Sequence, residues 1–330
     1  MSRTLPASVL VTGATGFVGG HVCSALMARG VAVRALTRRP DAALPAGVVR
    51  APARGLDDLG AIREALHGQE GVVHLAARVH QHSDDDDEAA RAVNVEGTRT
   101  LLEEAIAAGV RAFVFASSVK AVGERAELPW DESTRAAPVD PYGRTKLEAE
   151  GIVRELAARH GMHAPILRLP LVYGPGMKGN ALRLFRLVDR EWPLPFGLVR
   201  NRRSLLFTGN LVAALLATLE TASGDDTFFV SDAESPSTPE LVTAIARALE
   251  RRPRLVPVPV ALLRAAGRAG DLVARAIPFP LTTEAVSRLI ESLVVDSSRL
   301  SRSTGYTPPY SMAHGLGIAA EWYRHRFHPA

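Results

Sequence analysis

The sequence of 330 residues has one cysteine, few aromatic side chains and no long apolar run, and each shortage excludes a class of protein. Cys23 alone cannot build a framework of internal disulfides, and no Cys/His cluster has the spacing of a zinc site. Aromatic residues make up only 5% and the basic residues are scattered, which is not the pattern of a nucleic-acid-binding protein. The longest apolar stretch, 211–219, is too short to cross a bilayer. We therefore expect no membrane span, no signal peptide, and a reducing, cytoplasmic setting.

The rest of the composition is that of an ordinary globular protein with a mildly basic balance. Apolar residues make up 47% and charged residues 22%, which predicts one or two domains with a sizeable core. The formal net charge of +4 and the pI of about 9.6 suit an anionic small molecule. The acidic run 84–88 indicates the start of a helix, where acids complement the helix dipole, rather than a metal site. We therefore predict no bound metal.

Short segments rich in β-branched residues alternate with segments of helical periodicity through the first half of the chain. This alternation predicts an α/β protein with a Rossmann-type, doubly wound parallel sheet that carries helices on both faces. The predicted strands are 8–12, 31–36, 48–50, 72–75, 112–116 and 165–169, and the predicted helices are 16–29, 57–67, 84–108 and 141–160.

Three glycines, Gly13, Gly16 and Gly19, lie between the first predicted strand and the first predicted helix. Glycine permits a tight turn and lets a phosphate approach the backbone, and the helix N-terminus then offers free N–H groups to that anion. The spacing predicts a dinucleotide site. The alternative is a plain turn between strand and helix.

The composition of the sequence changes near residue 170, beyond which prolines cluster and loops separate shorter predicted helices. We therefore assign residues 1–170 to an NAD(P)-binding Rossmann domain and 171–330 to a smaller substrate-binding domain that caps the carboxyl ends of the strands. Residues 204–207 and 227–230 are candidates for strands that return to the main sheet. The last helix is predicted at 311–325, with Ser311 as its N-cap.

The second predicted strand ends in Thr37-Arg38-Arg39. An acidic residue at this place commonly holds a ribose 2′-hydroxyl, whereas an arginine suits a 2′-phosphate. No acid is present here, so Arg38 favours NADP(H), while NAD(H) stays possible. The alternative is that both arginines are solvated loop residues.

Tyr142 and Lys146 stand four residues apart in a predicted helix and therefore share one face. A neighbouring ammonium favours the phenolate, so Lys146 is expected to lower the pKa of Tyr142 from its ordinary value near 10. Ser118 follows a predicted strand and is placed to fix a substrate oxygen. Tyr142 can then exchange a proton with that oxygen while hydride moves to or from a nicotinamide. The alternative is a buried tyrosine beside a surface lysine.

With these motifs the chain resembles an extended short-chain dehydrogenase/reductase of the NAD-dependent epimerase/dehydratase family, the type that acts on nucleotide sugars, over nearly all of its length. The resemblance implies a catalytic set of Ser118, Tyr142 and Lys146. It implies cofactor contacts from Gly13, Thr15, Gly16, Phe17, Val18, Arg38, Leu56, Leu75, Ala76, Ala77, Asn94, Ala116, Tyr142, Lys146, Leu169, Pro170 and Val172, and substrate contacts from Lys120, Asn180, Arg203 and Arg288. It also implies a homodimer formed through the helices at 84–108 and 141–160.

Departures from the family pattern reduce the number of reactions that this chain is expected to catalyse. Relatives carry an Asp-Leu pair that contacts adenine, where this chain has Gly55-Leu56. Dehydratases follow the catalytic residue with Asp-Glu, whereas Ser118 is followed by Val119-Lys120, which argues against 4,6-dehydration. Epimerases often have Tyr-Gly where this chain has Val122-Gly123. Segments 117–120 and 178–180 resemble bacterial reductases of 4-keto-6-deoxy UDP-N-acetyl sugars, which serve surface polysaccharides.

Several functions therefore stay open. The first is reduction of a UDP-linked 4-keto sugar at C4 by NADPH, with Tyr142 as the proton donor. The second is a 4-epimerase of UDP-glucose or UDP-N-acetylglucosamine, which shows no net cofactor turnover. A hydroxysteroid or alcohol dehydrogenase shares the catalytic residues, and a non-catalytic NADP-sensing protein would commonly lack Tyr142 or Lys146. Lys120 is either a substrate contact or an exposed loop lysine.

Overall fold

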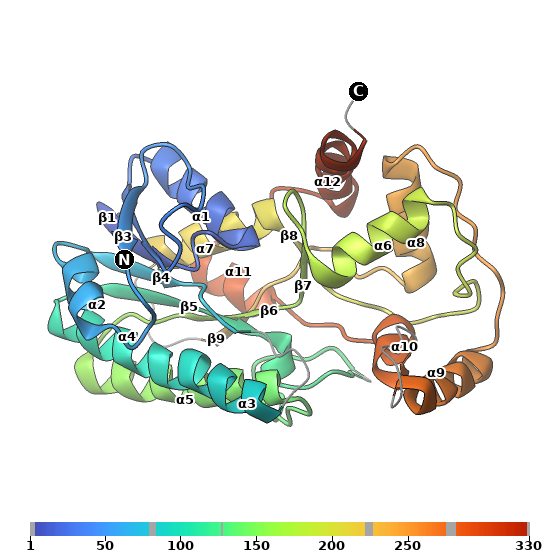
Figure 1. The fold of residues 1–330 in the computed structure, drawn as a ribbon, viewed down its shortest axis with the longest axis horizontal. Coiled ribbons are helices and arrows are strands. Elements are labelled where there is room, and N and C mark those ends of the chain that lie inside the picture. Colours follow the sequence, from blue (N-terminus) through green and yellow to red (C-terminus); the bar gives the residue numbers. More distant parts are fainter. Residues whose placement is uncertain (1–3, 79–83, 127, 222–226, 275–281, 329–330) are drawn as a thin grey trace.

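A seven-stranded parallel sheet forms the larger part of the molecule (Figure 1). The computed structural model describes residues 4–78, 84–126, 128–221, 227–274 and 282–328. The strand order is β3-β2-β1-β4-β5-β6-β9. The strands are β1 (Ser8–Thr12), β2 (Ala32–Thr37), β3 (Val49–Pro52), β4 (Gly71–His74), β5 (Ala112–Ser118), β6 (Ile166–Leu169) and β9 (Thr227–Phe229). The predicted α/β class and doubly wound sheet are confirmed.

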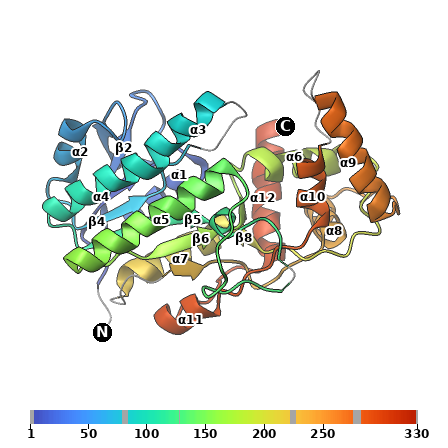
Figure 2. The same cartoon turned by 90° about the horizontal axis from the view of Figure 1, so that it is seen from below.

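Helices cover both faces of this sheet because its central strands are apolar on both sides. In β1, Val9, Leu10 and Val11 are all fully buried. One core lies under α1 (Phe17–Ala28), α7 (Thr208–Glu220) and α11 (Ser298–Thr304). The other lies under α2 (Leu59–Leu66), α4 (Gly97–Ala107) and α5 (Pro141–His160), and Figure 2 shows α4 and α5 side by side along the sheet.

The long helix predicted at 84–108 is interrupted. It runs as α3 (Asp84–Arg91), a π-helical turn at Ala92–Glu96, and α4. A π turn inserts one residue per turn and rotates the side chains that follow, and such turns are frequent at functional sites. The insertion points Asn94 into the protein, where it is 1% exposed.

The C-terminal part packs beside the carboxyl ends of the strands (Figure 1). It contains α6 (Gly179–Asp189), α8 (Thr238–Ala248), α9 (Val260–Ala274), α10 (Thr283–Ile290) and α12 (Met312–Phe327), around a third core. Ser311 caps α12 as predicted, because its hydroxyl accepts the His314 N–H. No helix in the described ranges is long and apolar enough to cross a membrane.

Of the two segments expected to return to the main sheet, only one does so. β9 pairs with β6 as predicted, but 205–207 forms β8 (Leu205–Phe207), which pairs with β7 (Leu171–Tyr173) in a separate two-stranded sheet. The cause is a buried carboxylate: Asp232 accepts hydrogen bonds from the Phe207 N–H at 2.9 Å and from the Tyr173 hydroxyl at 2.9 Å. Asp232, three residues after the end of β9, therefore binds both short strands.

Candidate active site

The glycine turn forms a cradle that side chains would fill. Gly13 has φ 71°, and a Cβ there would lie 2.8 Å from the Ala76 nitrogen. A Cβ on Gly19 would lie 2.2 Å from the Gly13 carbonyl oxygen, so both positions require glycine. The first turn of α1 carries no acidic residue, and Gly16 gives it no side-chain cap. The N–H groups of this helix end are therefore available to a phosphate, which fits a dinucleotide diphosphate.

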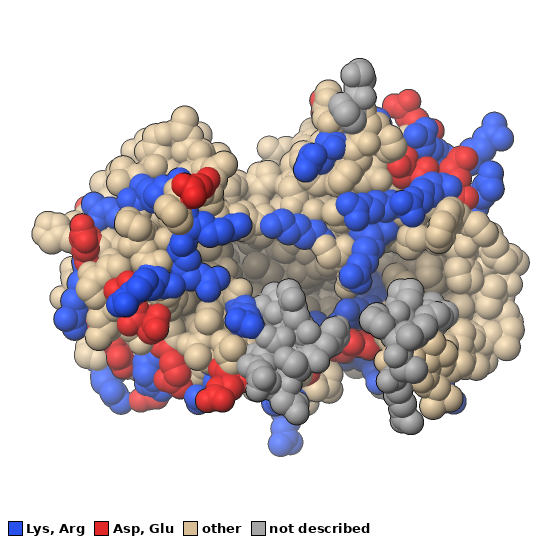
Figure 3. Space-filling model, in the orientation of Figure 1, with Lys and Arg blue, Asp and Glu red and all other residues tan. Residues whose placement is uncertain are grey.

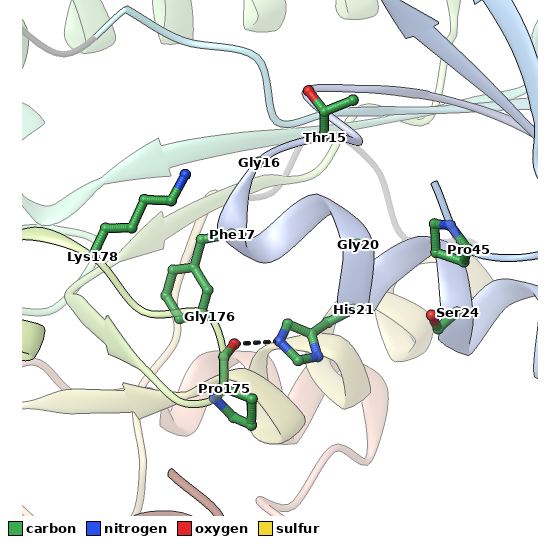
Figure 4. Close-up of a pocket in the computed structure, with 10 residues that line it drawn as sticks. All are labelled: Thr15, Gly16, Phe17, Gly20, His21, Ser24, Pro45, Pro175, Gly176 and Lys178. Atoms are coloured by element: carbon green, nitrogen blue, oxygen red, sulfur yellow. Dashed lines mark hydrogen bonds between the residues drawn. The ribbon is translucent and has the colours of Figure 1, made fainter. Parts of the chain in front are cut away.

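A groove of about 400 Å³ runs past the start of α1, between that helix and the segment after β7 (Figure 4). The His21 Nε2 and the Pro175 carbonyl oxygen lie 2.7 Å apart across its floor. The lining residues are Thr15, Gly16, Phe17, Gly20, His21, Ser24, Pro45, Pro175, Gly176 and Lys178. The C-terminal part of the chain therefore supplies one wall of the space beside the glycine turn.

At the end of β2 the arginine that reaches the glycine loop is Arg39. Its Nη2 donates to the Thr15 hydroxyl at 3.2 Å, and both Arg38 and Arg39 are exposed. The contact with the glycine loop therefore comes from the second arginine of the pair. Leu56 is the leucine that follows Gly55, where the family has an aspartate. It packs closely against Gly97: a Cβ on that glycine would lie 2.7 Å from the Leu56 Cβ.

The residues after β4 are held in place by buried polar groups. His74 is fully buried between the hydroxyls of Thr12, at 2.6 Å, and Thr98, at 3.0 Å. Burial lowers the pKa of His74 to about 3, so the ring is neutral. The Ala76 N–H donates to the Thr12 hydroxyl at 3.2 Å. Leu75, Ala76 and Ala77 therefore run directly over the glycine turn.

Asn94 connects this segment to the helix that carries the catalytic pair. Its side-chain oxygen accepts the Arg78 N–H at 2.7 Å, and its amide nitrogen donates to the Arg78 carbonyl at 2.9 Å and to the Thr145 hydroxyl at 3.1 Å. Its observed contacts are thus with the protein itself. Asn94 fixes the cofactor-side loop relative to α5.

Tyr142 lies in the first turn of α5, with Lys146 one turn further on. The helix begins here because Asp140 caps it, accepting the Gly143 N–H at 2.6 Å, and Pro141 occupies its first position. The helix end packs tightly on the turn that follows β5, since a Cβ on Gly143 would lie 2.3 Å from the Lys120 carbonyl oxygen. Tyr142 and Ser118 therefore lie at the same edge of the sheet.

The strand alternation decides which of two serines faces the cleft. Ser117 points inward and donates to the fully buried Glu150 at 2.6 Å, and Glu150 in turn accepts two hydrogen bonds from Arg168. Ser118 is half-buried on the opposite side, and its hydroxyl accepts the Lys120 N–H at 3.2 Å. Ser118 thus lies on the opposite face from the buried Ser117, and its contact with a substrate stays a prediction.

The expected lowering of the Tyr142 pKa is wrong for the ligand-free protein. Burial raises the pKa of the Tyr142 phenol, and the Asp140 carboxylate raises it further. Lys146 is 2% exposed, donates to the Ala116 carbonyl at 2.7 Å and lies 4.5 Å above the Phe115 ring. Burial lowers the pKa of Lys146 to about 7, while Glu150 opposes that shift. The spacing in the sequence puts the two groups on one face of the helix. It does not reveal how far burial shifts the pKa of each group toward its uncharged form.

Lys120 is half-buried and ion-paired, so the exposed-loop alternative is wrong, while its contact with substrate stays a prediction. Its ammonium forms ion pairs with Glu124, at 2.7 Å, and with Asp140, the residue that caps α5. The predicted substrate arginines come together nearby. Arg203 is half-buried and donates to the Glu291 carbonyl at 3.0 Å, while Glu124 and Arg288 lie close enough to act on its pKa. Burial lowers that pKa.

The remaining predicted residues frame the same cleft. Leu169 ends β6, Pro170 lies between β6 and β7, Val172 lies in β7, and Asn180 is exposed in the first turn of α6. Lysine and arginine side chains gather on both sides of the hollow between the sheet and the C-terminal part (Figure 3). Within the described residues no group of three or more His, Cys, Asp or Glu side chains could hold a metal ion. The arrangement suits an anionic ligand.

Comparison with known proteins agrees with this geometry. Residues 9–230 match the NAD dependent epimerase/dehydratase family. A UDP-glucose 4-epimerase of Vibrio cholerae is 34% identical over 97% of this chain and 96% of its own. The sterol demethylase protein B of Methylococcus capsulatus is 32% identical over 97% and 99%. The solved structure of MoeE5 in complex with UDP-glucose and NAD is 27% identical, covers 97% of this chain and 99% of its own, and superposes with a TM-score of 0.76.

The chain therefore belongs to the NAD dependent epimerase/dehydratase family and is an NAD(P)-dependent enzyme of the extended short-chain dehydrogenase/reductase type. The resemblance predicted from the glycine turn and the Tyr142–Lys146 pair is confirmed. Of the two arginines after β2, Arg39 makes the contact with Thr15, although the resemblance assigned the cofactor contact to Arg38.

Proposed function

We propose that this enzyme moves a hydride to or from C4 of a UDP-linked sugar. One observation carries the proposal: the glycine cradle, Ser118, Tyr142 and Lys146 lie at the carboxyl edge of one sheet, opposite the arginines of the C-terminal part. Residues 171–330 serve, in this proposal, as the substrate-binding domain, with Arg203, Arg288 and Asn180 toward the nucleotide. The solved relative with UDP-glucose and NAD supports this choice of ligands.

Each catalytic side chain has a defined task. A bound nicotinamide supplies hydride chemistry. The Ser118 hydroxyl hydrogen-bonds the sugar O4 and orients it. Tyr142 gives a proton to O4 in reduction or takes one in oxidation, and Lys146 places positive charge one turn away where the phenolate develops. Since burial raises the Tyr142 pKa in the free protein, the ammonium is needed to offset that cost.

The UDP-glucose 4-epimerase of Vibrio cholerae, which is similar over nearly the whole chain, supports 4-epimerisation, in which the same cofactor first accepts and then returns the hydride. Reduction of a 4-keto sugar is the second candidate. It is supported by Arg38 and Arg39 at the end of β2, where an acid for NAD would be expected, and by the contact between Arg39 and Thr15. NAD is the cofactor in the solved relatives, so NADP(H) belongs to the reductase alternative.

Absorbance of reduced nicotinamide separates these reactions. With UDP-glucose or UDP-N-acetylglucosamine, we expect the 4-epimer to accumulate while absorbance at the nicotinamide band stays constant. Stoichiometric loss of NADPH absorbance with a UDP-linked 4-keto sugar would instead establish the reductase. Turnover of a hydroxysteroid with no activity on either sugar nucleotide would contradict the proposal altogether.

We also propose a homodimer formed through α3–α4 and α5, which lie together on one face of the sheet (Figure 2). Arg91 and Glu148 form an ion pair between these helices, so this face is polar rather than a bare apolar surface. Sedimentation at micromolar concentration is expected to give twice the mass of the 35.3 kDa chain. A monomer under these conditions would refute the proposal.

A further inference from the structure

Lysine is rare in this protein, and its few positions are informative. Only three of the 39 Lys and Arg residues are lysines: Lys120, Lys146 and Lys178. Two of them already belong to the catalytic region, since Lys146 is the partner of Tyr142 and Lys120 pairs with the cap of α5. All the other residues in this count are arginines. A compact ammonium is therefore kept at three places, and the third has no role in the mechanism above.

Lys178 lies in the wall of the groove that faces the glycine turn. It lines this groove together with Thr15, Gly16 and Phe17, and its side chain extends toward Gly16 (Figure 4). Lys178 is exposed, and within the described residues its ammonium forms no hydrogen bond or ion pair. The positive charge is thus uncommitted, beside a helix end that is itself positive.

The backbone around Lys178 is fixed, which limits where its side chain can reach. Met177 is 1% exposed, and its N–H donates to the Gly174 carbonyl at 3.1 Å. A Cβ on Gly174 would lie 2.2 Å from the Thr208 hydroxyl oxygen, and one on Gly176 would lie 3.4 Å from the Phe17 ring. The loop is therefore wedged between α7 and α1. Lys178 follows directly and projects from this anchored loop into the groove.

We propose that Lys178 binds the diphosphate of the dinucleotide cofactor, from the side opposite the glycine turn. The N–H groups of α1 would hold the diphosphate from the sheet domain, and the Lys178 ammonium would close over it from the C-terminal part. The end of α1 and the Lys178 ammonium both present positive charge to the groove, and the negative charges of a diphosphate complement them. This inference rests on the proposed binding of a dinucleotide at the glycine turn.

The consequence is that the C-terminal part of the chain contributes to cofactor retention and not only to substrate binding. A lysine on the second wall must move away, or lose its contact, before the cofactor leaves. Slow release suits an epimerase, which needs the same cofactor for both hydride transfers. The nucleotide-sugar diphosphate is the other anion of this chemistry, and the groove favours the cofactor because the wall that faces Lys178 is the start of α1, with Thr15 and Gly16 of the glycine turn.

The scarcity of lysine gives a direct test. The protein, first shown to bind NAD(P)H by nicotinamide fluorescence, is treated with an amine-reactive reagent, and labelling is read at each lysine by mass spectrometry. Lys178 should be labelled fastest, because Lys146 is 2% exposed and Lys120 is ion-paired. Cofactor at about ten times its Kd should reduce labelling of Lys178 about tenfold, since only about one tenth of the protein then stays without cofactor. UDP-glucose alone should leave labelling unchanged.

Variants at the same position supply the second measurement. Lys178→Met should weaken cofactor binding about 10- to 100-fold, as expected for one lost charge-assisted contact, and should raise the dissociation rate. Lys178→Arg should restore most of the affinity. Arg247→Met on the distant α8 removes the same net charge and should leave the affinity unchanged.

Unchanged cofactor affinity in Lys178→Met, or protection of Lys178 by UDP-glucose but not by cofactor, would overturn this inference. Failure of the unmodified protein to bind any NAD(P)H would instead contradict dinucleotide binding itself. The two failures are therefore distinguishable.

Discussion

Tyr142→Phe is expected to lower kcat by about two to four orders of magnitude, the usual contribution of a positioned acid or base. The substitution removes only the phenolic hydroxyl. The ring stays in the first turn of α5, and the cap from Asp140 and the bond from Lys146 to the Ala116 carbonyl are untouched. Cofactor affinity and thermal stability should therefore be close to those of the unmodified protein. Turnover is measured with the sugar nucleotide that gives the 4-epimer or consumes NADPH.

A matched control separates loss of chemistry from loss of structure. Tyr310 packs its ring on Phe207 in the C-terminal part. Tyr310→Phe also removes one hydroxyl and should leave kcat unchanged. A rate loss of less than about threefold in Tyr142→Phe would remove the phenol from the mechanism, because an acid or base of this kind contributes far more. An equal loss in both variants would indicate a general effect of the substitution.

Lys146→Met is expected to abolish turnover while making the ligand-free protein more stable. Lys146 is 2% exposed, and burial lowers its pKa from 10.5 to about 7, so the folded state carries a charged group at a cost. Methionine fills a similar volume without that charge. After the lost bond to the Ala116 carbonyl is set against the gain, we expect the free energy of unfolding to rise by about 1 to 3 kcal/mol near neutral pH. Chemical denaturation checks this value.

The stability difference between these two proteins should depend on pH with a definite sign. Below the folded pKa of about 7, Lys146 is protonated in both the folded and unfolded states, and the full cost is present. Between about 7 and 10.5 the folded state has released its proton while the unfolded state has not, so stability of the unmodified protein rises with pH. The advantage of Lys146→Met should therefore be largest below pH 7 and should fade toward pH 10.5.

Charge removal elsewhere on the same helix should not reproduce this effect. Arg144 is exposed on α5, two residues from Tyr142. Arg144→Met should change stability by less than about 0.5 kcal/mol, as for ordinary surface positions. Loss of stability in Lys146→Met at every pH would show that the ammonium is held favourably in the free protein. That result would contradict the physical cause given for its lowered pKa.

The local motifs were readable from the sequence because each is fixed within a few residues of backbone. The spacing of Gly13, Gly16 and Gly19 requires a strand, a turn and a helix, and the structure has all three. Helix periodicity placed Tyr142 and Lys146 on one face without knowledge of any other segment. The apolar run 113–115 likewise places Ser118 at the carboxyl end of its strand, and β5 ends at that residue. These features depend on steric interactions between residues close together in the chain, so they can be predicted from the sequence.

Features that depend on partners far along the chain were decided only by the tertiary structure. Lys120 acquires its ion pair from Asp140, twenty residues on, and 205–207 leaves the main sheet because Asp232 binds it to β7. Tyr142 is half-buried, and the loss of solvent around its phenol raises the pKa, against the expectation drawn from its neighbour Lys146. Spacing along a chain determines which face of a helix or strand a side chain lies on. Its burial and its electrostatic environment depend on all the residues that pack around it. The sequence by itself therefore determined the fold class and the motifs of the family, and the fold decided the ionisation and the partners of the side chains in those motifs.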